Sequence, residues 1–191
     1  MNYEPPRPEA ATRDVLTLPL AYVRVTPAVI DAVPELGEAI RAFEPVPNAA
    51  GASVAEWLGE RALRDPQEAT VRVRLVHGKV TGVYALCAAQ VALAEEDRDR
   101  LGGAHYRTQP AVLLAQLARA SDAEGIGAEL LQHAAGTARR ALWYIGATVL
   151  VVDPFDEATD TYWREHWGLL PSEQRVPGNR QLWRLWASIT P

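Results

Sequence analysis

Two glycines separated by one residue, Gly125 and Gly127, are the residues whose types and spacing point most directly to chemistry. They stand between an apolar run of strand length and a segment with helical spacing. A glycine-bearing turn at the start of a helix exposes backbone N–H groups at the positive end of the helix dipole, where a pyrophosphate can bind. The pattern has a second interpretation, a tight turn whose left-handed backbone simply requires glycine.

The stretch from Ala111 to Asp153 contains the elements that must position this turn. A strand precedes the turn, a helix follows it, and a second strand comes after the helix at Ala147 to Val152. This last run has no polar alternation, which is typical of a strand covered on both faces. The apolar positions of the first strand are Val112, Leu113, Leu114, Leu117 and Ala118, and those of the helix include Leu130, Leu131, Ala134, Ala138, Ala141 and Ile145.

Four further stretches occur in the order of a known superfamily. They are VAEWLGERA (Val54–Ala62), GVYALCAAQV (Gly82–Val91), LLAQLAR (Leu113–Arg119) and VLVVDPFDEATDTY (Val149–Tyr162), followed by Trp167-Gly168-Leu169. Together with the glycine turn, they resemble the GNAT N-acetyltransferase superfamily, and most closely its toxin-type branch. The resemblance covers roughly residues 43 to 187.

The resemblance implies a fold and a ligand. The fold is α/β, a mixed, mostly antiparallel twisted sheet of six or seven strands flanked by helices, with a splayed central pair of strands. The ligand is acetyl-CoA, which serves as the co-substrate in this superfamily. Close relatives of the toxin branch acetylate the amino group of aminoacyl-tRNA, stop translation and are held inactive by a small antitoxin. The acceptor of this chain could equally be a small amine or a protein N-terminus.

The resemblance also implies site residues. The coenzyme would lie on the strand and turn at Leu117, Ala118, Arg119, Glu124, Gly125, Ile126, Gly127 and Ala128. The general acid would be Tyr162, because the superfamily places this tyrosine four residues after an alanine, here Ala158. A phenol can supply the proton that a departing thiolate needs.

Two features depart from the superfamily pattern near Tyr162. Thr161 stands where an aromatic residue is usual, and Gly168 follows Tyr162 by six residues instead of four. These departures favour an alternative, a non-catalytic GNAT-fold binding or regulatory protein with altered or lost CoA binding.

The turn itself departs from the superfamily pattern, which begins with Arg or Gln. If Gly125 and Gly127 are the two glycines of the motif, Asp122 takes the position of the Arg or Gln. If the apolar positions of the helix fix the alignment instead, the loop is two residues shorter than the motif and Ala123 takes the place of the first glycine. Asp122 and Glu124 place negative charge beside an anionic ligand. One such charge at about 5 Å opposes binding by roughly 3–4 kcal/mol before screening. Arg119, Arg139 or Arg140 could compensate for it.

Composition bounds the remaining possibilities. The chain has 191 residues and a net charge of −5, which does not indicate a surface that attracts nucleic acid over its whole area. Lys79 is the only lysine. The only cysteine, Cys87, excludes an internal disulfide and any cysteine metal cluster. No apolar run reaches membrane-spanning length, so we expect a cytoplasmic protein with no membrane partner. A homodimer is an expectation from the superfamily alone.

The rest of the chain completes the expected organisation. Residues 1–14 are predicted to form a flexible arm, and residues 15–191 a single GNAT-like domain. Pro34 interrupts an apolar helical pattern and predicts either two short helices or one helix that starts at Pro34. Further predicted elements are a strand over Val15–Val25, a helix capped by Ser53, a half-solvated strand over Ala69–Val76, a hairpin turn at His77-Gly78, a loop over Leu169–Asn179 and a closing strand over Arg180–Ile189.

Overall fold

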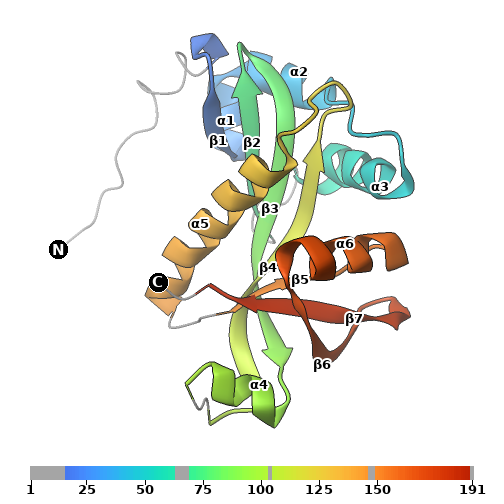
Figure 1. Cartoon of the computed structure of the whole chain (residues 1–191). Coiled ribbons are helices and arrows are strands. Elements are labelled where there is room, and N and C mark those ends of the chain that lie inside the picture. Colours follow the sequence, from blue (N-terminus) through green and yellow to red (C-terminus); the bar gives the residue numbers. More distant parts are fainter. Residues whose placement is uncertain (1–15, 63–68, 103–104, 146–148, 190–191) are drawn as a thin grey trace, which may run out of the picture. The chain divides into compact units, whose positions relative to one another are not determined.

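The computed structural model describes residues 16–62, 69–102, 105–145 and 149–189, so the predicted arm over residues 1–14 lies outside the described residues. Seven strands in these ranges form one sheet in the order β1-β2-β3-β4-β5-β7-β6 (Figure 1). The strands are β1 (Ala21–Val25), β2 (Thr70–Val76), β3 (Lys79–Ala92), β4 (Thr108–Arg119), β5 (Val149–Val152), β6 (Leu170–Val176) and β7 (Asn179–Ser188). The helices are α1 (Pro27–Ala32), α2 (Pro34–Arg41), α3 (Ala49–Trp57) with a π-helical extension η2 (Leu58–Ala62), α4 (Glu95–Arg100), α5 (Gly127–Ile145) and α6 (Glu157–Trp167). The predicted mixed α/β sheet is confirmed.

The chain divides into two compact parts. The first contains the described residues up to Ala85 together with Gln116–Leu130, and the second contains Leu86–Ala115 and the described residues from Leu131 onward. Strands β3 and β4 and helix α5 each contribute to both parts. The single domain over residues 15–191 therefore stays a prediction, and each part is described by itself below.

The start of the first part follows the expected helix signals. The Thr26 side chain accepts a hydrogen bond from the Val29 N–H at 3.2 Å, and Pro27 occupies the first turn of α1. Pro34 likewise opens α2, so the structure has two short helices, the first of the two predicted alternatives. Both prolines lack an N–H group that a helix interior would require, and the first turn is the place where this loss costs least.

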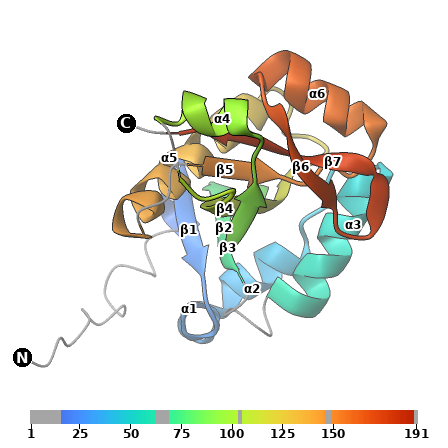
Figure 2. The same cartoon turned by 90° about the horizontal axis from the view of Figure 1, so that it is seen from below.

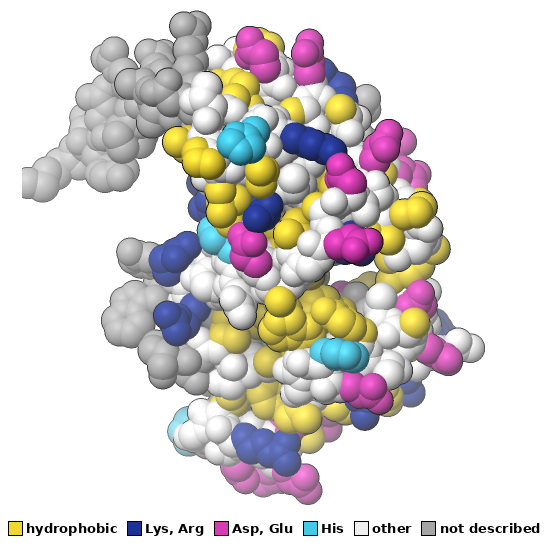
Figure 3. Space-filling model, turned by 45° about the horizontal axis from the view of Figure 1, so that its top comes forward, with side chains coloured by type: hydrophobic (Ala, Val, Ile, Leu, Met, Phe, Trp, Pro, Cys, Tyr) yellow, Lys and Arg dark blue, Asp and Glu magenta, His cyan; other side chains and the backbone are white. Residues whose placement is uncertain are grey.

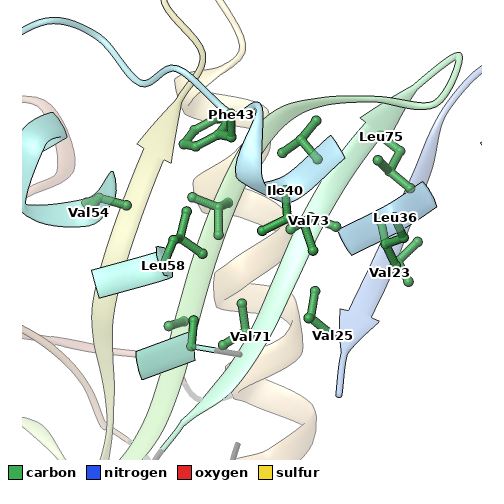
Figure 4. Packing of buried hydrophobic residues seen from close by; sticks show 14 of the residues in the cluster. Val23, Val25, Leu36, Ile40, Phe43, Val54, Leu58, Val71, Val73 and Leu75 are labelled. Atoms are coloured by element: carbon green, nitrogen blue, oxygen red, sulfur yellow. The ribbon is translucent and has the colours of Figure 1, made fainter. Parts of the chain in front are cut away.

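Apolar side chains from these helices and the first strands form the core of the first part. Val23 and Val25 of β1 alternate with outward-facing residues, and Leu36 and Ile40 of α2 pack against the same cluster (Figure 4). The cluster also contains Phe43, Val54, Leu58, Val71, Val73 and Leu75. Helices α1 and α2 are thus held against one face of β1 and β2 by hydrophobic burial.

The opposite face of these strands carries a buried charge, which corrects the prediction of a half-solvated strand over Ala69–Val76. Arg74 of β2 is 9% exposed. Its Nε and Nη2 atoms donate to the two carboxylate oxygens of Glu129, each at 3.0 Å. Its Nη1 atom donates to Thr81 Oγ1 at 2.8 Å, and Tyr22 donates to Glu129 Oε1 at 2.9 Å. The first turn of α5 is therefore attached to β1, β2 and β3 by one hydrogen-bonded cluster.

We expect Glu129→Gln to lower the free energy of unfolding by about 1–2 kcal/mol, less than for a fully buried pair because the Glu129 side chain is 44% exposed. The substitution leaves Arg74 buried without its charged partner. Urea denaturation followed by circular dichroism measures the change. Glu124→Gln, at an exposed position on the preceding turn, is the matched control and should shift stability by no more than about 0.5 kcal/mol. Equal effects of the two variants would show that the Arg74 contact contributes nothing.

The same cluster raises the pKa of Tyr22 to about 12, first because the phenol is desolvated and then because it donates to the Glu129 carboxylate. Folding thus favours the neutral phenol. The stabilisation should be fully present below pH 10, where the phenol is protonated in both states, and should be lost as the pH rises towards 12. We therefore expect the stability difference between the wild type and Tyr22→Phe to shrink as the pH rises above 10. A difference independent of pH from 9 to 11.5, measured by urea denaturation, would contradict this account.

The second part contains the other half of the sheet. β4 pairs with β5 in parallel, Ala111 opposite Val149 through Leu114 opposite Val152, and β7 pairs with both β5 and β6 in antiparallel fashion. The β4–β5 pairing ends where β5 ends at Val152, whereas β4 continues to Arg119. Val91, Leu93, Ala111, Val149, Val151 and Trp186 are buried together beside this pairing.

Three predicted boundaries were wrong. β1 begins at Ala21 instead of Val15, because Pro19 precedes it and cannot donate to a ladder. The helix predicted to start at Ser53 begins at Ala49, where the Asn48 side chain accepts from the Gly51 N–H at 2.7 Å. The loop predicted over Leu169–Asn179 contains β6, an edge strand with Pro171 and an irregular register against β7 (Figure 2).

Candidate functional site

The glycine turn lies in the first part, between β4 and α5. Gly125 has φ 78°, a left-handed conformation that favours glycine, and α5 begins at Gly127. The Leu130 N–H donates to the Ile126 carbonyl at 2.9 Å, which is the first bond of the helical ladder. The N–H groups of Gly127 and Ala128 therefore lie in the opening turn of the helix, where no acceptor within the helix exists for them.

Space for a ligand is present beside both glycines. A Cβ atom placed on Gly125 or Gly127 would meet no other atom within 4 Å. The left-handed backbone at position 125 thus favours glycine. At position 127 the absence of a side chain leaves the first turn of α5 uncovered. Glu124 and Ala128 are exposed, and Ile126 is half-buried. The turn combines the positive end of a helix with an open surface, which suits an anionic group.

Arg119 organises the turn from inside. Its Nη1 atom donates to the carbonyl oxygens of Ala120, Ser121 and Ala123 at 3.1, 3.4 and 3.5 Å. The guanidinium group is thereby held at the turn by the backbone of the turn itself. Arg140, another predicted compensating cation, instead donates to Thr137 Oγ1 one helical turn earlier on α5, and Arg139 is exposed on the same helix.

The acidic residue of the turn has a cationic partner that sequence reasoning did not identify. Lys79, the first residue of β3, donates a hydrogen bond from Nζ to Asp122 Oδ2. The side chains are 61% and 60% exposed. The bond from Lys79 is the main reason that the pKa of Asp122 is lowered. No spacing in the sequence could have indicated this pair, because the two residues are 43 positions apart.

The end of β4 is also bonded to the segment before α3. The Val46 N–H donates to the Arg119 carbonyl at 3.3 Å, and the Ser121 N–H donates to the Glu44 carbonyl at 2.9 Å. The predicted pantetheine-binding residues Leu117, Ala118 and Arg119 are each half-buried. The Arg119 carbonyl therefore already has one hydrogen bond, which restricts main-chain pairing with a ligand at this residue.

Tyr162 lies on α6, in the second part. The helix begins with a capping box in which the Thr159 N–H donates to Asp156 at 2.8 Å and the Asp156 N–H donates to Thr159 at 2.9 Å. Tyr162 is 42% exposed and its ring stacks on His166, with centroids 4.9 Å apart. The neighbouring Trp163, at 8% exposure, takes the buried position of the helix. The Tyr162 phenol is thus accessible and is not a core packing group.

A hollow of about 470 Å³ lies elsewhere in the second part. Leu113 of β4, Gln174 and Arg175 of β6 and Arg184 of β7 line it. Arg184 is bound to Asp153 by two hydrogen bonds of 2.7 Å, so its charge is neutralised. The buried Oε1 atom of Gln174 has no hydrogen-bond partner within the described residues.

A nucleophilic cysteine site finds little support in the structure. Burial raises the pKa of the half-buried Cys87 thiol, which makes it a weak nucleophile. Among the residues that the structure describes, no cluster of His, Cys, Asp or Glu has the composition of a metal site, and no helix has the length and apolar character to cross a bilayer.

We expect Gly125→Ala to destabilise the protein by about 1 kcal/mol, because a side chain at φ 78° is strained even where space is available. Gly136→Ala, inside α5 with equal free space, should instead stabilise it by about 0.5–1 kcal/mol. Thermal unfolding of the two variants measures both changes. Effects of the same sign at the two positions would contradict the left-handed assignment.

Comparisons with known proteins locate the fold. No family model and no curated protein matches the chain. Solved structures do match it. AtaT complexed with acetyl-methionyl-tRNAfMet aligns with a TM-score of 0.67 and 20% identity, over 88% of this chain and 94% of that chain. AtaTR bound with acetyl-CoA aligns with a TM-score of 0.64 and 18% identity, over 89% of this chain and 94% of that chain. A tyrosine-to-phenylalanine mutant of KacT aligns with a TM-score of 0.66 and 16% identity, over 90% of this chain and 96% of that chain.

These matches extend over most of each chain and concern the fold. The glycine turn between β4 and α5, the parallel β4–β5 pair and the following α6 agree with the expected GNAT order. The chain therefore has the fold of AtaT and KacT, the GNAT-type fold that its sequence resemblance predicts.

Proposed function

We propose that this protein is an acetyl-CoA-dependent N-acetyltransferase that acts on a primary amine. The observation that carries the proposal is the similarity of the fold, over 89% of the chain, to AtaTR bound with acetyl-CoA. The open turn at Gly125 and Gly127 adds local support, because it offers helix N–H groups to an anion. Acetyl-CoA, when bound, supplies an activated thioester carbonyl.

The residues of the first part fit the coenzyme's diphosphate. The N–H groups of Gly127 and Ala128 would donate to phosphate oxygens, and the positive helix end favours their charge. Gly125 and Ile126 shape the turn, and Glu124 is exposed beside it. Strand residues Leu117, Ala118 and Arg119 would lie along the pantetheine arm. The Arg119 guanidinium adds positive charge at the turn carbonyls.

Tyr162 is our candidate for the general acid. Its hydroxyl group can hold a proton and donate it to the leaving sulfur, so that no thiolate has to depart into water. The stacked His166 ring and the edge-on Trp163 ring restrict the rotation of the Tyr162 side chain. Thr161, at the position where the superfamily has an aromatic residue, is exposed on α6.

The finer proposal is a toxin that acetylates aminoacyl-tRNA. It is supported by the similarity to AtaT complexed with acetyl-methionyl-tRNAfMet and to AtaT bound to the C-terminus of the antitoxin AtaR. On this proposal the chain works in the cytoplasm, forms a homodimer and has an antitoxin-like partner. The net charge of −5 argues against extensive phosphate contacts, and the face drawn in Figure 3 carries acidic and basic side chains interspersed. Small amines and protein N-termini are therefore the competing acceptors.

A non-catalytic GNAT-fold binding protein is the second candidate. The acidic residues Asp122 and Glu124 at the turn and the six-residue interval between Tyr162 and Gly168 favour it. The interval has a structural origin, since α6 continues to Trp167 and ends at Gly168 in a left-handed conformation.

We expect the wild type to bind acetyl-CoA and to transfer labelled acetyl groups to a primary amine. Tyr162→Phe should lower kcat by about 10²–10⁴-fold while leaving the affinity for acetyl-CoA unchanged, because only the proton donor is lost. Tyr106→Phe is the matched control, since Tyr106 is 80% exposed and outside the proposed site. Calorimetry measures binding, and filter assays with aminoacyl-tRNA, peptides and small amines measure transfer.

Each result separates the candidates. Binding of acetyl-CoA without transfer to any acceptor would favour the non-catalytic protein. The absence of binding at millimolar acetyl-CoA would reject the enzyme. Induced expression in a bacterial host should arrest growth if the chain is a toxin, and Tyr162→Phe should relieve the arrest. Normal growth with the wild type would reject the toxin proposal but not the proposed acetyltransferase activity.

A further inference from the structure

We propose that Lys79 supplies the cation for the coenzyme diphosphate, in the role that an Arg or Gln of the turn would otherwise fill. The inference rests on the proposed function, because it concerns the same turn. It explains how a turn with two acidic residues could hold an anion. Lys79 is far from the turn in sequence and enters it only through the fold.

The backbone places Lys79 at the turn. The Ala120 N–H donates to the Thr81 carbonyl at 2.8 Å, which joins the start of β3 to the end of β4. Lys79 lies two residues before Thr81, and Asp122 lies two residues after Ala120. The two side chains meet from these positions. The His77-Gly78 turn, with φ values of 46° and 77°, directly precedes Lys79.

Charge at the turn is balanced by this contact. Asp122 and Glu124 contribute two negative charges, Arg119 contributes one positive charge that is bonded to the turn carbonyls, and Lys79 contributes the second. An ammonium group has three donors, so Lys79 can bond to Asp122 and to a phosphate oxygen together. Its four-carbon stem is flexible, and its 61% exposure leaves the group free to approach a ligand.

Fold stability does not account for the pair. Ion pairs as exposed as Lys79 and Asp122 contribute little to folding. A purely structural role would therefore leave little trace in any measurement. A role in diphosphate binding predicts that the loss of Lys79 weakens the binding of acetyl-CoA while the free energy of unfolding stays unchanged.

The test is calorimetric titration of the full chain with acetyl-CoA and with acetyl-pantetheine, which lacks the diphosphate. We expect Lys79→Met to weaken acetyl-CoA about tenfold and to leave acetyl-pantetheine unchanged, because one charged hydrogen bond is lost. Lys79→Arg should restore most of the affinity. Arg140→Met, which removes one exposed positive charge at the far end of α5, is the matched control and should have no effect. Thermal unfolding of Lys79→Met should match the wild type.

A second experiment in the Asp122→Asn variant distinguishes direct contact between Lys79 and the phosphate from simple neutralisation of the Asp122 carboxylate by Lys79. We expect Lys79→Met to weaken acetyl-CoA in this background as well, since the bond to phosphate does not depend on the carboxylate. A loss that disappears in Asp122→Asn would overturn the proposal, and so would unchanged affinity in Lys79→Met itself. If the wild type binds no acetyl-CoA, the proposed function fails together with this inference. Binding by the wild type with no effect of Lys79→Met refutes only the role of Lys79.

Discussion

The contact between Arg74 and Glu129 is the constraint on which the first part of the molecule depends. A guanidinium group in the middle of β2 is desolvated, and both carboxylate oxygens of Glu129 satisfy it. Glu129 lies in the first turn of α5, so the bond fixes the helix start against the strands. Tyr22 and Thr81 complete the hydrogen bonding from β1 and β3. A glycine turn attached in this way is held in place by contacts within the chain itself.

The electrostatics of that turn come from three separate segments. Asp122 belongs to the turn, Arg119 ends β4, and Lys79 opens β3. Glu129 carries negative charge near the helix N-terminus, where the dipole favours it, but its carboxylate is bound to Arg74. Asp122 and Glu129 therefore each have a specific cationic partner near the helix start. The described hydrogen bonds and ion pairs include no partner for the exposed Glu124. The repulsion expected from the sequence is reduced by contacts that close only on folding.

In the second part, a single glycine marks the passage from a helix to an edge strand. Gly168 ends α6 with φ 66°, and Leu169 and β6 follow at once. The residues of β6 include Pro171, Ser172 and Glu173, which sequence rules assign to a loop. They form a strand because β7 supplies the ladder at the sheet edge, where a proline is tolerated. Tyr162 remains accessible because the adjacent Trp163 fills the buried face of α6.

The sequence by itself determined the local features: the strand–turn–helix–strand order around Gly125, the break in the helical pattern at Pro34, and the hairpin at His77-Gly78. These features depend on periodicity and on residues with restricted or unusual backbone angles, both of which are readable over a few positions. Only the tertiary structure decided that Arg74 is buried, that Lys79 meets Asp122 and that β6 is a strand. Each of these depends on a partner that lies far away in the chain or across the sheet, and no local pattern encodes such a partner.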